Sequence, residues 1–362
     1  MTTATPIFVV GPSRSGTALT RALLNAHPHV HLAGETHYYD DLRTRFRGRE
    51  SERLINEAER RACEDYFLAL THRPYGHAGV ADQGSMARDD LRTEAERLGG
   101  SPDAYFEAYC RLRASGHGAS RWGEKTPRHV FRIPEILECF RDAQVVCLVR
   151  DPRAVVASYR DWRNQGGFDL DADPDHASIL EEEQERTSGS YHPIILSLLW
   201  NGQVNAMIEA RECFGTERVR IQRYEDLVAG NEASVRGLSS WLDLEYDTAM
   251  LDVPMQNSSF SRFDRGSGIS TDAVDRWRSR LNDTELAIIQ TTCRSLMRTF
   301  DYEAKRVKPS PVGLLGCLAK FPVVGIRALQ LNRDRAGGSL PAYIMRRARL
   351  ITGFGRNRRP IA

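Results

Sequence analysis

The stretch from Ile7 to Thr17 reads IFVVGPSRSGT and indicates the fold of the chain. Four consecutive apolar residues, Ile7 to Val10, are typical of a strand buried on both faces of a parallel sheet. The glycine-rich turn Gly11–Thr17 then leads into a segment, 19–26, with the apolar spacing of a helix. A strand, a glycine-rich turn and a helix in this order predict an α/β fold whose first turn can hold a phosphate group.

The same order recurs further along the chain. The apolar runs Val145–Val149 and Val219–Ile221 predict two more buried strands, and Val30–Ala33 can supply another. Because strands and helices alternate, we expect a P-loop-type, three-layer α/β fold with a central parallel sheet.

Two charged segments interrupt this alternation. Residues 38–118 are rich in helix-forming residues and predict a helical insertion, and the acidic segment 161–190 predicts a loop or lid. We therefore expect an α/β domain over residues 1–304 and a separate basic extension over residues 305–362.

Composition limits the classes of function. With 41% hydrophobic and 27% charged residues among 362, the chain is typical of a soluble globular protein. Its net charge of only +2 gives no overall positive field, so nucleic acid is not an expected partner. Seven widely spaced cysteines without a C-x-x-C pair, and no basic segment before Ile7, favour a cytoplasmic location.

The C-terminal extension differs from the rest in charge. From Lys305 to Ala362 there are 13 Lys and Arg residues against one acidic residue, Asp334. An apolar run over 311–331 precedes most of these cations, so the segment could meet an anionic membrane surface. The alternative, which we favour from the sequence, is a helix docked on the core with a solvated basic tail. A homodimer also remains open.

The turn Gly11–Thr17 fits the pattern G-x-x-x-x-G-[ST] but lacks the lysine that contacts ATP phosphates in kinases. Arg14 supplies a cation inside the loop instead. No apolar strand ends in the Asp of a magnesium site, because the second strong strand ends in Arg150.

Arg150 and Ser158 form a second candidate anion site. Arg150 ends a predicted strand, and Ser158 lies about two turns into the next helix. Ligands bind at this edge of open α/β sheets, and an arginine fork suits a phosphate monoester. The alternative is a surface pair between Arg150 and Asp151, although Asp151 is also placed to cap the helix that begins at Pro152.

Several dispersed motifs resemble the sulfotransferases that use 3′-phosphoadenosine 5′-phosphosulfate (PAPS). They are GPSRSGTALTRALLNAHP from Gly11, GETH from Gly34, GEKTP from Gly123, LVRDPRAVVAS from Leu148, RYEDL from Arg223, NSSF from Asn257 and WRSRL from Trp277. The chain looks most similar to bacterial members and to the tyrosylprotein sulfotransferase branch.

The resemblance implies a role for each matching position. Arg14, Ser15, Gly16, Thr17 and Ala18 would bind the 5′-phosphosulfate, although the family more often has threonine where this chain has Ala18. Arg150 and Ser158 would bind the 3′-phosphate, and Tyr224, Ser258, Ser259 and Arg262 would line the nucleotide pocket. Glu35 would be the general base, and Lys125, assisted by Arg14, would stabilise the bridging oxygen without a metal ion.

The residues leave alternatives at this site. His37 is a rival base, and we favour Glu35 because burial can raise the pKa of a carboxyl toward neutrality. Glu124 could be the ion-pair partner of its neighbour Lys125. His27, His29 and His31 alternate as metal ligands on a strand would, but Pro28 interrupts the pattern, so no metal is expected.

We therefore expect a PAPS-dependent transferase acting on a hydroxyl of a small-molecule, carbohydrate or lipid-linked acceptor. The alternatives are a P-loop metabolite kinase and an inactive nucleotide-binding homologue. Six aromatic residues could line an acceptor pocket or belong to the core: Tyr38, Tyr39, Phe46, Trp122, Trp162 and Phe168.

Overall fold

The computed structural model contains one sheet of five parallel strands in the order β2-β3-β1-β4-β5. It describes residues 5–72, 86–162, 185–186, 188–253, 269–332, 341 and 344–345. The strands are β1 (Ile7–Val10), β2 (Val30–Ala33), β3 (Arg121–Lys125), β4 (Gln144–Val149) and β5 (Val219–Arg223). The parallel sheet with helices on both faces confirms the predicted fold class.

The helices are α1 (Thr17–Asn25), α2 (Glu57–His72), α3 (Arg88–Arg97), α4 (Pro102–Gly116), α5 (Ile133–Cys139), α6 (Pro152–Trp162), α8 (Pro193–Phe214), α9 (Tyr224–Ala229), α10 (Asn231–Trp241), α11 (Asp272–Asp275), α12 (Trp277–Arg280), α13 (Asp283–Thr292), α14 (Arg294–Thr299) and α15 (Pro311–Leu331). Short 3₁₀ helices are η1 (Arg43–Phe46), η2 (Pro127–Arg132) and η3 (Thr248–Leu251).

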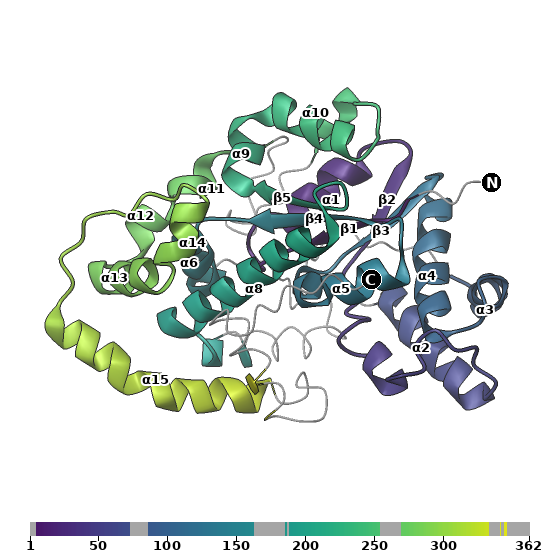
Figure 1. Cartoon of the computed structure of the whole chain (residues 1–362), viewed down its shortest axis with the longest axis horizontal. Coiled ribbons are helices and arrows are strands. Elements are labelled where there is room, and N and C mark those ends of the chain that lie inside the picture. Colours follow the sequence, from purple (N-terminus) through teal and green to yellow (C-terminus); the bar gives the residue numbers. More distant parts are fainter. Residues whose placement is uncertain are drawn as a thin grey trace.

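Alternate residues of each strand face opposite layers. Ile7 and Val9 of β1 pack with side chains of α1, α9 and α10, whereas Phe8 and Val10 pack with the layer that contains α4, α5, α6 and α8. In Figure 1 the sheet crosses the middle of the molecule, with α9 and α10 above it and α5 and α8 below. This double burial explains why the strand β1 is apolar along its whole length.

Strand β3 was not predicted from the sequence. Three of its five residues, Arg121, Glu124 and Lys125, are charged, yet the whole strand is buried between β2 and β1. The side chain of Arg121 donates to the backbone oxygen of Thr5 over 2.6 Å and also bonds Gln144. Gly123 packs so closely against the backbone of Ile7 that a Cβ atom would overlap its carbonyl oxygen. Hydrogen bonds, a glycine and one aromatic side chain, Trp122, therefore hold this central strand.

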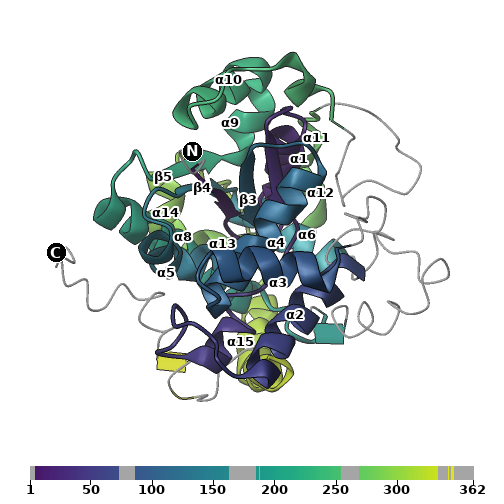
Figure 2. The ribbon, with the colours of Figure 1, turned by 90° about the vertical axis from the view of Figure 1, so that its right-hand side faces the viewer.

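Between β2 and β3 the chain forms the helices α2, α3 and α4, which lie together at one side of the sheet (Figure 2). Their core is aromatic, and Phe106 of α4 stacks on Tyr38 with ring centroids 4.8 Å apart and contacts Phe8 of β1. This packing fixes the segment after β2, which carries Glu35 and His37, against the body of the sheet.

Candidate active site

All five strands end at the same edge of the sheet and each is followed by a residue expected at the site. The loop Gly11–Thr17 follows β1, Glu35 and His37 follow β2, Lys125 ends β3, Arg150 follows β4, and Tyr224 follows β5. Parallel strands bring their carboxyl ends together, so the topology gathers these groups from positions more than 200 residues apart in sequence.

The loop Gly11–Thr17 depends on two glycines with positive φ. Gly11 (φ 144°) lies against the backbone of Leu148, and Gly16 (φ 95°) lies against the ring of Tyr224, so neither has room for a Cβ atom. Gly16 caps α1 without a side-chain hydrogen bond to the helix N-terminus. The first backbone N–H groups of α1 thus face the loop, in the arrangement that binds anions.

Two arginines meet beside this loop. Nη1 of Arg150 donates a 2.8 Å hydrogen bond to the backbone oxygen of Arg14, and Nε of Arg14 donates to Oγ of Ser158 over 3.0 Å. Burial lowers the pKa of the Arg14 guanidinium to about 10, and the charge of Arg150 contributes to that shift. Two cations and a hydroxyl are therefore held together, as expected for phosphate binding.

Arg150 is buried beside neutral groups and a second cation, Arg14. Its Nη2 donates to the backbone oxygen of Ala273 over 2.6 Å, and its guanidinium lies 4.4 Å from the centre of the Tyr224 ring. Its Nε is buried without a hydrogen-bond partner, and within the described residues no carboxylate forms an ion pair with it. Because a buried charge without a counter-ion is costly, Arg150 is suited to receive an anion.

The alternative pairing of Arg150 with Asp151 is wrong. Asp151 forms a 2.6 Å ion pair with Arg153 and accepts a 2.8 Å hydrogen bond from the backbone N–H of Arg153. Asp151 is thus the expected cap of α6, and Arg153 in turn lies over the ring of Trp277.

Glu35, Lys125 and His37 form one cluster. Nζ of Lys125 lies 2.5 Å from Oε1 of Glu35, and Nε2 of His37 lies 3.4 Å from Oε2 of the same carboxylate. Burial alone would raise the pKa of Glu35, but Lys125 and His37 outweigh it and hold that pKa below its ordinary value. The expectation that burial raises the pKa of Glu35 is therefore wrong, and the carboxylate is ionised at neutral pH.

Glu124 is not the partner of Lys125. Neighbours on a strand point to opposite faces, and the fully buried Glu124 carboxylate instead bonds Thr36, Thr126 and His129. Thr36 donates to Oε1 of Glu124 through its backbone N–H over 3.1 Å and through its hydroxyl over 3.0 Å. Thr36 lies between Glu35 and His37, so Glu124 positions the segment that carries the candidate base.

Some expected site residues are placed elsewhere or not described. Ser258, Ser259 and Arg262 lie outside the described residues, as do Phe168 and the side chain of Trp162. The aromatic residues Tyr38, Tyr39, Phe46 and Trp122 are buried in the core, so they do not form an open acceptor wall. Ala18 lies in the first turn of α1, directly after Gly16 and Thr17.

The three alternating histidines do not converge on a common point. Nε2 of His27 bonds the backbone oxygen of Glu245 over 2.9 Å, whereas the ring of His31 stacks on His117 at 3.8 Å. In the part of the chain that the structure describes, no group of three His, Cys, Asp or Glu side chains could hold a metal ion.

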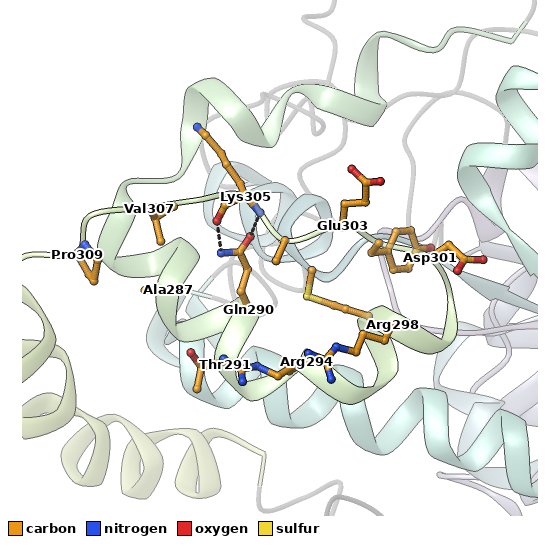
Figure 3. A pocket seen from close by; sticks show the side chains of 13 residues that line it. Ala287, Gln290, Thr291, Arg294, Arg298, Asp301, Glu303, Lys305, Val307 and Pro309 are labelled. Atoms are coloured by element: carbon orange, nitrogen blue, oxygen red, sulfur yellow. Dashed lines mark hydrogen bonds between the residues drawn. The ribbon is translucent and has the colours of Figure 1, made fainter.

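A cavity of about 730 Å³ lies between α13, α14 and the segment that follows them (Figure 3), and Tyr302, which lines it, contacts Arg223 at the end of β5. Across it, the side chain of Gln290 donates to the backbone oxygen of Lys305 over 3.0 Å and accepts from its N–H over 2.7 Å. These two hydrogen bonds fasten the segment that leads from α14 to α15.

Comparison with known proteins places this geometry among sulfotransferases. The model of the Sulfotransferase family matches residues 6–248. Protein-tyrosine sulfotransferase A of Caenorhabditis elegans is 24% identical over 304 residues, which cover 81% of this chain and 66% of that protein. Carbohydrate sulfotransferase 3 of Homo sapiens is 27% identical over 179 residues, or 46% of this chain and 34% of that protein. The chain thus spans just under two thirds of the first relative and about one third of the second.

Among solved structures, the sulfotransferase domain from the curacin biosynthetic pathway superposes with a TM-score of 0.50. The two chains are 18% identical, and the superposition covers 83% of this chain and 99% of that domain. At 18% identity, this similarity shows a shared fold and nothing beyond it.

Proposed function

The chain belongs to the sulfotransferase family, and we propose that it transfers a sulfuryl group from PAPS to a hydroxyl of a small-molecule, carbohydrate or lipid-linked acceptor. One observation carries the proposal: three groups lie at the same edge of the sheet. They are the buried Arg150, which pairs with no carboxylate of the described residues, the N-terminus of α1, and the Glu35–Lys125 ion pair. The first two groups suit a nucleotide with two anionic ends, and the pair suits proton removal next to a cation.

The two anion sites bind opposite ends of the nucleotide. In this proposal Arg14 and the N–H groups from Ser15 to Ala18 bind the 5′-phosphosulfate. Arg150 and Ser158 bind the 3′-phosphate, with Arg14 Nε holding the Ser158 hydroxyl in place over 3.0 Å. Tyr224 packs on both Gly16 and Arg150 and so fixes the distance between the two sites.

Glu35 is suited to accept the proton of the acceptor hydroxyl. As that oxygen forms its bond to sulfur, the proton passes to a Glu35 carboxylate oxygen while the bond from sulfur to the bridging oxygen breaks. The lowered pKa of Glu35 keeps the carboxylate ionised and able to accept at neutral pH. The electrons of the broken bond stay on the leaving phosphate, where charge accumulates.

Lys125 is suited to neutralise this developing charge. Its ammonium group is buried, and Glu35 holds it at 2.5 Å, so it requires little reorganisation during the reaction. When Glu35 takes up the proton it loses its charge, and Lys125 is then free to interact more strongly with the leaving oxygen. The base and the cation that stabilises the leaving group are thereby coupled through one ion pair.

His37 takes the second place in this scheme. Its Nε2 lies 3.4 Å from Oε2 of Glu35, so it orients the carboxylate and stabilises its negative charge. In the same position the imidazole of His37 could itself be the base, with Glu35 orienting the imidazole. Variants of the two residues, described in the Discussion, separate these roles.

The first experiment is a calorimetric titration with 3′-phosphoadenosine 5′-phosphate, with ATP plus magnesium as the comparison. We expect metal-independent binding that Arg150→Ala weakens by about 1.5–3 kcal/mol, the contribution of a charged hydrogen bond. Arg236→Ala is the matched control, because Arg236 is exposed on α10 and contacts Glu232 and the ring of Tyr246 rather than the loop Gly11–Thr17. Selective binding of ATP with magnesium would instead support the metabolite kinase, and nucleotide binding without sulfuryl transfer to any acceptor would support the inactive homologue.

A further inference from the structure

Within the described residues, helix α15 contacts the rest of the protein along one side. The backbone oxygen of Cys317 lies 3.1 Å from Nε2 of His192, and the ring of Phe321 lies 5.6 Å from the same imidazole. At the end of the helix, Nδ2 of Asn332 lies 3.4 Å from Oγ of Ser190. Although these contacts fix the helix to the start of α8, none of its 21 residues is buried.

The opposite side of α15 is apolar and exposed. Its large side chains are between 55% and 80% exposed and recur every three to five residues: Val312, Leu315, Leu318, Val323 and Ile326. We call these five residues the outer face of α15. Among the described helices, α15 is also the one long and apolar enough to cross a membrane by length and composition. A contiguous apolar face of this kind on a soluble domain indicates a contact surface.

The charged residues in the sequence of α15 and of the segment after it are almost all basic. Within α15 the charged residues are Lys320 and Arg327, both basic, and the sequence after it continues with eight arginines and one acidic residue, Asp334. Cations next to an anionic lipid surface each contribute about 1 kcal/mol to binding, whereas they would repel a second copy of the same basic segment. Charge therefore favours an anionic bilayer over a partner copy.

Helix α15 is attached at the end of α8 that lies nearer the candidate active site. Helix α8 ends just before β5 begins, so its first residue, Pro193, points toward the carboxyl edge of the sheet. Nε1 of Trp200 bonds the backbone oxygen of Arg150 at that edge over 3.0 Å. His192, which holds α15, lies roughly two helical turns or about 12 Å further out. In Figures 1 and 2, α15 runs along the lower edge of the molecule.

We propose that the outer face of α15 docks on the surface of a membrane that contains anionic lipids. The helix lies in the interface rather than across the bilayer, because its inner side is bonded to the start of α8 and Lys320 stands near its middle. The two hydrogen bonds between Gln290 and Lys305 hold the preceding segment, so the docked helix is rigidly connected to the domain.

This docking does not depend on the proposed function, but it has a consequence for it. If the transferase proposal holds, docking brings the end of α8 nearest the carboxyl edge close to the bilayer, and acceptors whose hydroxyl lies at a membrane surface gain access. Vesicle binding and nucleotide binding are separate measurements, so failure of one proposal leaves the other tested on its own.

The test is co-sedimentation of the full chain with vesicles of phosphatidylcholine and of phosphatidylcholine mixed with phosphatidylglycerol. We expect binding to the mixed vesicles that weakens with added salt, and at least about tenfold weaker partition of the triple variant Leu315→Ser/Val323→Ser/Ile326→Ser. Ile55→Ser, which removes an equally exposed apolar side chain (82%) elsewhere, should bind as the unaltered chain does.

Two results would overturn the proposal. One is that the triple variant and the unaltered chain sediment with the mixed vesicles to the same extent, including the case in which neither protein sediments with them. The other is a dimer in analytical ultracentrifugation that the triple variant converts to a monomer while neither protein binds vesicles, which would assign the face to a second copy. An unchanged far-UV circular dichroism spectrum and an unchanged midpoint of urea unfolding show that the triple variant is folded, whether or not the protein binds the nucleotide.

Discussion

The ammonium group of Lys125 lies 2.5 Å from the carboxylate of Glu35, although 90 residues separate them in the sequence. The register of the sheet explains the contact: Ala33 of β2 pairs with Glu124 of β3, so the residues that follow each strand leave the sheet side by side. The candidate base and the cation that would stabilise the leaving group are thereby one ion pair, and changes to one residue must alter the other.

Replacing Lys125 should change both the rate and its dependence on pH. In Lys125→Met we expect kcat to fall by about 10²-fold or more, the usual loss when a cation at the developing charge is removed. Because Lys125 lowers the pKa of Glu35, its loss should raise that pKa, so the acid limb of the kcat/KM profile should move to higher pH. The exposed Lys320→Met is the control, and an unmoved acid limb would refute the coupling.

Comparison of the variants Glu35→Gln and His37→Gln shows which of the two residues is the general base. We expect Glu35→Gln to lower kcat by about 10²–10⁴-fold, the range for loss of a general base, while binding of 3′-phosphoadenosine 5′-phosphate is kept. His37→Gln should cost less, because the glutamine can still donate to Glu35. The reverse order of the two losses, measured in single-turnover assays, would make His37 the base.

Glu124 should matter for stability rather than for chemistry. It forms a fully buried pair with His129, and Glu124→Ala leaves that histidine and Thr36 without their acceptor, so unfolding in urea should be easier by about 3 kcal/mol. Glu135→Ala removes a partly exposed carboxylate from Arg132 and should change stability by less than about 1 kcal/mol. Equal effects of the two substitutions would contradict the positioning role.

From the buried carboxylate of Glu124 we also predict how the stability of the protein depends on pH. Burial opposes ionisation of Glu124, but His129, Thr126 and Thr36 outweigh it and lower its pKa below the ordinary value. A carboxyl with a lowered folded-state pKa contributes stability above its unfolded pKa, and this contribution is lost as the pH falls through the folded value. The loss of stability below about pH 4 should therefore be shallower in Glu124→Gln than in the unaltered chain.

The sequence predicted the strands that contain an apolar run, and it failed at β3. Strands β1, β2 and β4 were recognised because both faces of the sheet are covered by helices and require mainly apolar side chains. The edge strand β5, VRIQR, was recognised from the weaker run Val219–Ile221. In β3, Arg121 and Glu124 satisfy their polar groups with partners from distant segments. Such long-range bonds leave no periodic pattern in the sequence, although the GEKTP motif, which begins in β3, still identified Lys125.

At the site, residue types were easier to predict than their partners. The loop Gly11–Thr17, Arg150 and Ser158 meet as expected, because strand ends of a parallel sheet must converge. The direction of the Glu35 pKa shift was wrong, since it depends on Lys125 and His37, whose distances follow from the register and not from the local sequence. The exposure of the α15 outer face likewise depends on which side meets α8.

Gly16 offers a final test of the nucleotide site. Its φ of 95° disfavours any side chain, and a Cβ atom would overlap the ring of Tyr224, which also packs on Arg150. Gly16→Ala should therefore displace the Tyr224 ring and weaken binding of 3′-phosphoadenosine 5′-phosphate by about tenfold or more. Gly116→Ala, at the end of α4 with open space around it, should bind normally.

A double-mutant cycle separates the two causes of this loss. Tyr224→Ala removes the ring that Gly16→Ala would strike, so the double variant should lose less affinity than the sum of the single variants. The remaining loss, about 1–2 kcal/mol, is the cost of the left-handed backbone for alanine. Strict additivity in calorimetric titrations would show that Tyr224 and the loop act independently, and the proposed role of Tyr224 in spacing the two anion sites would then fail.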